Sequence, residues 1–176
     1  GPHLKGANIL GAIVPVPWTS NEVITPQQIV TKLDLGSNDI SPKGFQPLIE
    51  YIMDTSLSGN LRELILGSEP GDLYANKMDT KTACMLAKAL EINHSVQVLN
   101  LNRNTGIGKR SQMAFKCLAT AFQKNLALRE LRLGEVGMSA QSAIAILNVL
   151  ANHENLEVLD LHGNGLTHEI TKHLRR

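Results

Sequence analysis

One short pattern recurs along the chain and constrains its fold more than any other feature. The pattern is apolar-x-x-Leu-x-Leu-x-x-Asn-x-apolar, and its clearest copy runs from Leu156 to Leu166. The central leucines of five copies lie 31, 35, 32 and 28 residues apart, at Leu33, Leu64, Leu99, Leu131 and Leu159. A repeat of roughly 20 to 50 residues is typical of proteins built from stacked structural units.

Each copy predicts a short strand with one buried and one exposed face. Side chains two positions apart on a strand point to the same face, so Leu33 and Leu35 enter the core while the residue between them faces solvent. Three copies end on an asparagine, at Asn38, Asn104 and Asn164. A carboxamide there can bond to backbone groups exposed as the chain turns inward. Copies two and four carry Glu69 and Val136 at the corresponding position.

A helical pattern follows each strand. In the best example, apolar residues recur at helical spacing at Ala83, Leu86, Ala87 and Leu90. We expect N-caps at Ser41, Ser139 and Thr167, and helix ends at Asn93, Asn125 and His153. The chain therefore predicts an α/β leucine-rich-repeat solenoid, or horseshoe, with parallel strands on the concave face and helices on the convex face.

Two local motifs resemble known families. The alternation of repeats with and without the asparagine, at a period near 28 residues, resembles the ribonuclease-inhibitor-like subclass of leucine-rich repeats. Residues 85–93 followed by Val96, and the Asn-x-x-Leu-Arg turn at 125–129, resemble segments of the actin-associated CARMIL and tropomodulin proteins. The repeat resemblance covers residues 29–176, and the likeness to the actin-associated proteins implies a cytosolic scaffold near actin filament ends. Ran GTPase-activating proteins share these motifs, which would imply stimulation of GTP hydrolysis.

The chain divides into two parts. Residues 1–28 do not follow the repeat and are expected to form an N-terminal flank or cap, with Trp18 covering the first layer. Pro15 and Pro17 favour an extended backbone there, and an exposed proline-containing ligand segment is the alternative. Residues 29–176 hold about five repeats, the last one truncated. The opening Gly1-Pro2-His3 resembles a protease-cleavage scar.

Composition argues against several classes of function. The chain has 17 Lys and Arg against 16 Asp and Glu, which is not the basic excess of nucleic-acid-binding proteins. No run of about 18 apolar residues predicts a membrane span. Cys84 and Cys117 fall on apolar helix positions outside any Cys-x-x-Cys pair, so we interpret them as small buried hydrophobic residues in the reduced state. This interpretation predicts a cytoplasmic location.

No catalytic, metal or cofactor site is predicted. Residues 104–111 resemble a phosphate-binding loop, but its first glycine would fall at Arg103, and Lys109 is followed by Arg110 rather than Ser or Thr. His162 and His168 lack a third metal ligand. No nucleophile is placed beside a base by its spacing. We therefore expect no cofactor and no enzymatic activity.

The predicted contact surface comprises an inserted loop and the exposed strand positions. Repeat two is longer than the others between its strand and its helix, and the insertion, residues 68–77, would emerge at the rim of the concave face. A tolerated surface insertion is the alternative. The strand residues form ladders, and Arg132 is expected to pair with Asp160 on the next strand. The predicted protein-binding residues are Asp72, Tyr74, Lys77, Asn100, Asn102, Arg103, Arg132, Asp160 and His162.

These features together predict a non-enzymatic protein-interaction module with one or more protein partners, with actin regulation as one context. Three alternatives stay open: a GTPase activator of the Ran-activator type, the repeat domain of an innate-immune receptor, and a pathogen effector. The sequence leaves the oligomeric state and the identity of the partner undetermined.

Overall fold

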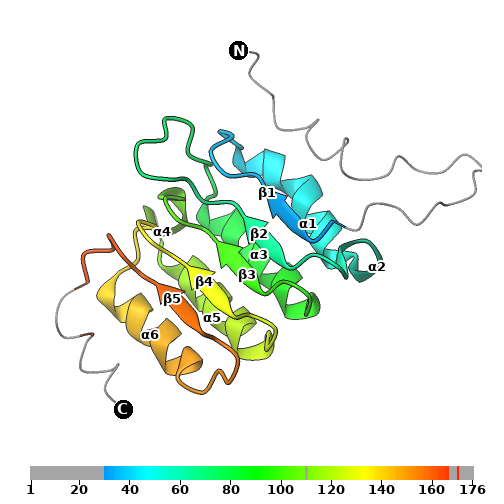
Figure 1. Ribbon diagram of the computed structural model, residues 1–176. Coiled ribbons are helices and arrows are strands. Elements are labelled where there is room, and N and C mark those ends of the chain that lie inside the picture. The colour runs from blue at the N-terminus through cyan, green and yellow to red at the C-terminus, as the bar shows by residue number, and fades with distance from the viewer. Residues whose placement is uncertain (1–29, 110, 167–169, 171–176) are drawn as a thin grey trace, which may run out of the picture.

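The five predicted strands form a single parallel sheet. In the computed structural model, which describes residues 30–109, 111–166 and 170, the strands are β1 (Lys32–Asp34), β2 (Glu63–Ile65), β3 (Val98–Asn100), β4 (Glu130–Arg132) and β5 (Val158–Asp160). They lie side by side in chain order (Figure 1). Leu33, Leu64, Leu99, Leu131 and Leu159 share one register across the sheet. The repeat assignment and its register are therefore confirmed.

The helices cover the opposite face of the sheet, as the horseshoe prediction requires (Figure 1). They are η2 (Pro42–Phe45), α1 (Gln46–Met53), α2 (Thr55–Ser58), α3 (Thr80–Ile92), α4 (Gly106–Lys109), α5 (Met113–Lys124) and α6 (Ala140–Leu150). Ser41, Asp79 and Ser139 cap η2, α3 and α6 by accepting a hydrogen bond from a backbone amide in the first turn. Thr167 and the flank 1–28 lie outside the described residues.

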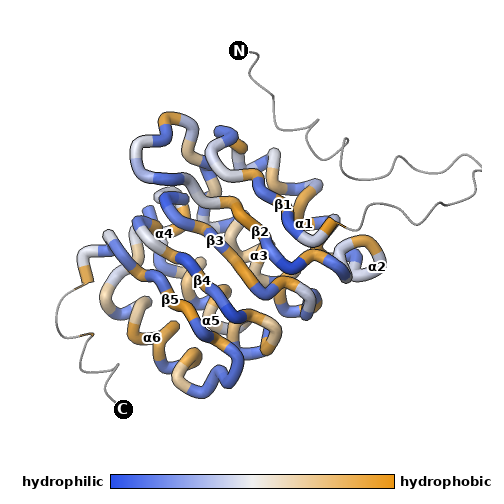
Figure 2. Tube along the Cα trace, viewed as in Figure 1, coloured by the Kyte–Doolittle hydropathy of each residue, from blue (hydrophilic) through white to orange (hydrophobic). Residues whose placement is uncertain are grey.

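The core lies between the sheet and the helices, and it is built mainly from aliphatic side chains. Leu64, Leu99 and Leu131 are fully buried, while Leu159 in the last layer is only partly buried. Figure 2 shows apolar and polar residues alternating along the strands, which follows from the two-residue period of a strand. Within the described ranges, no helix is both long and apolar enough to cross a bilayer.

Cys84 and Cys117 form a disulfide, so their interpretation as separate reduced thiols is wrong. Cys84 lies on α3 and Cys117 on α5, and their Cα atoms are 5.2 Å apart, within the range that a disulfide needs. Both predicted helix patterns were right, but sequence spacing alone did not reveal that the two positions meet. A cytoplasmic location can therefore no longer be inferred from reduced cysteines, because disulfides are rare in that compartment.

Asparagines join successive layers at the C-terminal ends of the strands. The Nδ2 of Asn104 donates to the carbonyls of Leu66 and Leu101, at 3.0 and 3.1 Å. In repeat two the same role falls to Asn76, whose Nδ2 donates to the Leu35 and Leu66 carbonyls at 2.8 and 2.9 Å. The assignment of Glu69 to this position was therefore wrong: the inserted loop leaves the repeat after Leu66 and rejoins it at Asn76.

A second set of polar side chains joins the layers at the N-terminal ends of the strands. Asn93 and Asn125 cap the C-terminal ends of α3 and α5 as predicted. Asn125 Nδ2 donates to the carbonyl of Asn93 at 2.7 Å, and His153 Nε2 lies 2.8 Å from the carbonyl of Asn125. The helix α6 ends earlier than expected, with Ala151 rather than His153 at its C-cap. Side-chain hydrogen bonds to buried backbone groups therefore join the layers at both ends of the strands.

Candidate protein-binding rim

The inserted segment, residues 68–77, is an ordered loop at the C-terminal edge of the strands, and we name it the rim loop (Figure 1). The carboxylate of Asp72 accepts hydrogen bonds from the hydroxyl of Ser37 and, at 2.9 Å, from the Glu69 amide. The Tyr74 carbonyl accepts the Asp39 amide at 2.8 Å. Backbone and side-chain bonds to repeat one therefore fix the loop at several points.

At its C-terminal end the loop is held by Asn76 and by an ion pair between Lys77 and Asp39. Asn76 is 3% exposed, and its Oδ1 accepts the Ile40 amide at 2.8 Å. The Lys77 amide donates to the Ile40 carbonyl at 2.9 Å, and its Nζ lies 2.5 Å from Asp39 Oδ1. Of the predicted contact residues, Lys77 therefore lies at the base of the loop.

The tip of the rim loop presents two large side chains to solvent. Leu73 is 89% exposed and Tyr74 is 52% exposed. Tyr74 was among the predicted contact residues but Leu73 was not, although both belong to the predicted insertion, residues 68–77. The signal was available: Leu73 follows Gly71 and Asp72, outside the strand and helix periods.

The predicted ladders exist, but two of the predicted contact residues within them are buried. The middle ladder runs across the sheet in the expected order, with Asn100 beside Arg132 and Arg132 beside Asp160. Asn100 is 4% exposed and Asn102 is 8% exposed. Asn100 Oδ1 accepts the Asn102 amide at 2.9 Å, and Asn102 Oδ1 accepts the Gly134 amide at 2.7 Å. Both asparagines therefore hold neighbouring backbone in place and offer little contact area.

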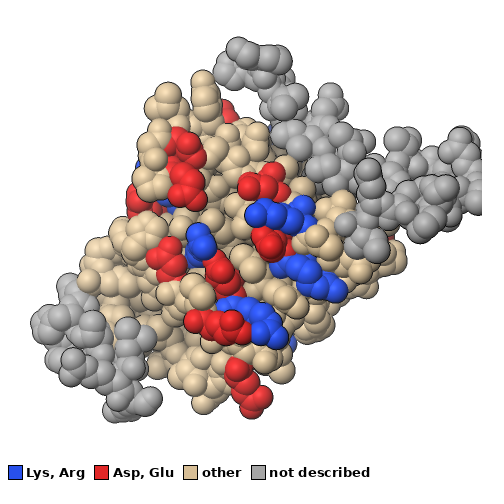
Figure 3. All heavy atoms as spheres, in the orientation of Figure 1, with Lys and Arg blue, Asp and Glu red and all other residues tan. Residues whose placement is uncertain are grey.

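Opposite charges pair with one another across the concave face, which Figure 3 views directly. The predicted pairing of Arg132 with Asp160 is wrong, because Arg132 instead bonds to Glu130 on its own strand. Lys32 pairs with Glu63 at 3.1 Å, and Arg129 with Glu157 at 2.6 Å. Each exposed pair adds only about 0 to 1 kcal/mol of stability, so its main effect is to leave the face polar without a dominant charge.

A cluster of charged residues lies where β3, β4 and β5 end. The Nη1 of Arg103 is 3.0 Å from Glu135 Oε1, and the Nε2 of His162 is 3.6 Å from the same oxygen. His162 Nδ1 lies 2.8 Å from Asp160 Oδ1. A Cβ on Gly134 would lie 2.2 Å from the His162 ring, so glycine is required for the ring to lie there. Arg103 also lowers the pKa of Asp72 by its charge, after the larger effects of the hydrogen bonds from Ser37 and Glu69.

The histidine in this cluster has a raised pKa. The hydrogen bond to Asp160 is the main cause, and the charges of Asp160 and Glu135 add to it. Burial raises the pKa of Asp160, but the hydrogen bonds from His162 and Asn102 more than offset this effect, so the pKa of Asp160 is lowered overall. The two groups therefore form a pair in which His162 is charged over a wider pH range than a free histidine.

This pairing predicts a pH-dependent contribution to stability. Because the folded state raises the pKa of His162 above 6.5, its contribution is complete below about that pH and is lost as the pH rises through the folded-state pKa. Urea unfolding should show that His162→Gln costs more stability at about pH 5.5 than at about pH 8.5, with a difference below about 1 kcal/mol because half of the ring is exposed. An NMR titration midpoint at or below that of a free histidine would contradict the pairing.

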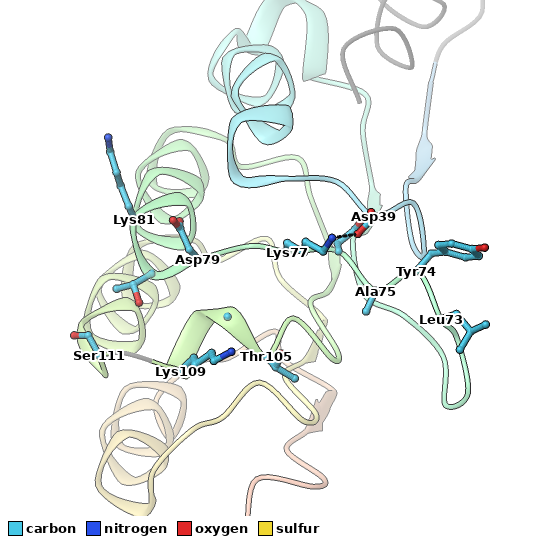
Figure 4. Close-up of a pocket in the computed structure, with 13 residues that line it drawn as sticks. Asp39, Leu73, Tyr74, Ala75, Lys77, Asp79, Lys81, Thr105, Lys109 and Ser111 are labelled. Atoms are coloured by element: carbon cyan, nitrogen blue, oxygen red, sulfur yellow. Dashed lines mark ion pairs between the residues drawn. The ribbon is translucent and has the colours of Figure 1, made fainter. Parts of the chain in front are cut away.

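A groove of about 1000 Å³ lies on the other side of the rim loop (Figure 4). Its lining includes Leu73 and Ala75 of the rim loop, Lys81 of α3, and Thr105, Lys109 and Ser111 near α4. The residues that resembled a phosphate-binding loop form part of this wall, with α4 as a single short helix at 106–109. In the described part of the chain, no group of three or more His, Cys, Asp or Glu side chains could hold a metal ion.

Comparisons with known proteins agree with the fold. Two family models, each described as leucine-rich repeat, match residues 28–48 and 155–176. No curated protein matches the sequence. A solved structure of the leiomodin-1 actin-binding site 2 has a TM-score of 0.61 and 16% sequence identity, and the match covers 82% of this chain and 76% of that chain. At this identity the likeness concerns the fold. The chain is a leucine-rich-repeat protein whose fold resembles that of the leiomodin segment.

Proposed function

We propose that this chain is a non-enzymatic protein-interaction module, and that it binds its partner through the C-terminal rim of the sheet. The contact residues are Leu73 and Tyr74 at the tip of the rim loop, with Asp72, Arg103 and His162 beside them. The exposure of Leu73 on an anchored loop is the observation that carries this proposal. Single exposed apolar residues are common on protein surfaces. Here the exposed leucine stands at the tip of a loop that buried hydrogen bonds hold in place, and this arrangement favours a contact site.

The anchoring of the loop supports a role in binding. A loop that is already fixed by Asn76 and Asp72 loses little conformational entropy when a partner packs against it, so more of the contact energy appears as affinity. Leucine and tyrosine at the tip can fill a pocket on a partner, and the tyrosine hydroxyl adds a polar contact.

The concave face supports the same proposal in a different way. Its charges are paired internally through Lys32, Glu63, Glu130 and Arg132, so a partner that lies across it need not neutralise a large net charge. Such a surface gives area and specificity, while the apolar tip of the rim loop supplies the anchor. No arginine lies in the rim loop, so we do not extend the proposal to GTPase activation.

Actin is the partner that we propose to test first. The resemblance of residues 85–93 and 125–129 to tropomodulin and CARMIL segments points to it, and so does the fold shared with the actin-binding site of leiomodin-1. Purified actin should bind the immobilised chain as monomers, as filaments or in both forms. If actin binds, the double variant Leu73→Asp/Tyr74→Ala should weaken binding at least tenfold, which corresponds to about 1.4 kcal/mol.

A matched control separates the rim from general surface changes. Leu126→Asp also places a carboxylate on an exposed leucine, since Leu126 is 56% exposed, but it lies after α5 at the opposite edge of the strands. This variant should bind actin as the unmodified chain does. Equal binding by the rim variant would contradict the position of the site, and no binding of either form of actin would contradict the choice of partner.

A further inference from the structure

The groove beside the rim loop contains two lysines that form no ion pair within the described part of the chain. Among its acidic residues, Asp39 pairs with Lys77, and Asp79 caps α3 by accepting the Thr82 amide at 2.8 Å. Lys81 and Lys109 also line the groove, and neither forms an ion pair with another described residue. The acids of the groove are therefore engaged within the chain. The charge of Lys81 acts on Asp79, but neither lysine is in ion-pair contact with a described residue.

The two sides of the groove differ in chemistry. Figure 4 shows Lys81 and Ser111 at one side, Lys109 and Thr105 across the middle, and Leu73 at the far side on the rim loop. The lysine ammonium groups and the two hydroxyls can all donate hydrogen bonds. Leu73 and Ala75 offer apolar contact. A ligand that fits this arrangement carries negative charge at one end and an apolar group at the other.

We propose that the groove binds a short acidic segment of a protein partner. Carboxylates of the segment pair with Lys81 and Lys109, and an apolar side chain packs against Leu73 and Ala75. This inference rests on the proposed function, since it takes the rim loop as a contact surface, and it adds the chemical class of the ligand. A nucleic acid fits less well, because two lysines neutralise few phosphates and Tyr74 is the single aromatic residue of the lining, whereas single-stranded nucleic acids stack on several aromatic side chains.

A selection with random peptides tests the inference directly. Twelve-residue peptides displayed on phage are selected on the immobilised full chain and, in parallel, on Lys81→Glu/Lys109→Glu. The unmodified chain should enrich peptides with two or more Asp or Glu residues beside an apolar residue, and the variant should not. A labelled synthetic peptide from the enriched set should bind at least tenfold more weakly to the variant, and its affinity should fall as salt is added.

The matched control is Lys88→Glu/Lys116→Glu, which makes the same change in net charge. Lys88 lies on α3, two turns after Lys81, and Lys116 lies on α5; both are exposed and neither lines the groove. This control should bind the peptide within about twofold of the unmodified chain, and thermal unfolding should confirm that both variants fold.

Three results would overturn the inference: no enrichment of acidic peptides, an equal loss of binding in the control, or lysine-dependent binding of an oligothymidine instead of a peptide. Each of these leaves the proposed function standing if Leu73→Asp/Tyr74→Ala still weakens partner binding. Unchanged partner binding by that rim variant would instead overturn the proposed function.

Discussion

Replacing both Cys84 and Cys117 by serine should lower the free energy of unfolding by about 3 to 4 kcal/mol. The disulfide spans a sequence separation of 33 residues, and a cross-link of this length removes about that much conformational freedom from the unfolded chain in the loop-entropy account. It also ties α3 to α5, so it joins repeats two and three on the convex face. Urea unfolding under non-reducing conditions measures the effect.

Reducing agent provides the control for this prediction. A reductant should destabilise the unmodified chain by a similar amount and should leave the double-serine variant unchanged. Two titratable thiols in the folded, unreduced chain would contradict the disulfide and favour two separate buried thiols. The test also bears on location, because a cytosolic actin-binding role requires the fold to survive reduction.

Asn76→Ala should destabilise the chain by about 2 to 4 kcal/mol. The change removes three hydrogen bonds to the backbone of Leu35, Ile40 and Leu66. The Leu35 carbonyl and the Ile40 amide then lose these side-chain partners, while the Leu66 carbonyl keeps the bond from Asn104. An unpaired buried polar group costs about 1 to 3 kcal/mol, and partial opening of the rim loop to water would reduce the total. Chemical unfolding measures the loss of stability.

Asn38→Ala is the matched control for Asn76→Ala. Asn38 has the same side chain and occupies the same position in repeat one, but its Nδ2 makes one local bond, to the Gly36 carbonyl at 2.9 Å. Its replacement should cost no more than about 1 kcal/mol. Equal effects of the two changes would mean that Asn76 has no special role in joining the layers.

The sequence was sufficient to predict the sheet, its register and most of the helices, because these depend on local periods of two and 3.6 residues. It could also have placed Asn76, since Asn76-Lys77-Met78 repeats the Asn-x-apolar ending of Asn38-Asp39-Ile40. Counting a fixed three residues from the second strand leucine, Leu66, led instead to Glu69. A fixed spacing fails wherever an insertion separates the strand from the asparagine.

Other features depend on contacts that no single repeat contains. The disulfide requires α3 and α5 to place their cysteines side by side. The pairing of Arg132 with Glu130 lies within one repeat, but the choice of Glu130 over Asp160 depends on side-chain conformation. The exposure of Leu73 depends on where the loop is anchored. The predicted contact residues therefore separated into three groups. Asp72, Tyr74, Lys77 and His162 are exposed, Arg103, Arg132 and Asp160 are partly buried, and the two asparagines are buried and support the backbone.

Both proposals require the rim loop to be an ordered part of the repeat stack. Hydrogen exchange of individual amides tests this requirement without any partner. The amides of Ile40 and Lys77, which bond to Asn76 Oδ1 and the Ile40 carbonyl, should be protected in the unmodified chain. They should lose that protection in Asn76→Ala, while the amide of Leu101 in the centre of the sheet keeps it. Exchange of Ile40 and Lys77 at the rate of an unfolded chain, before any substitution, would contradict an ordered loop.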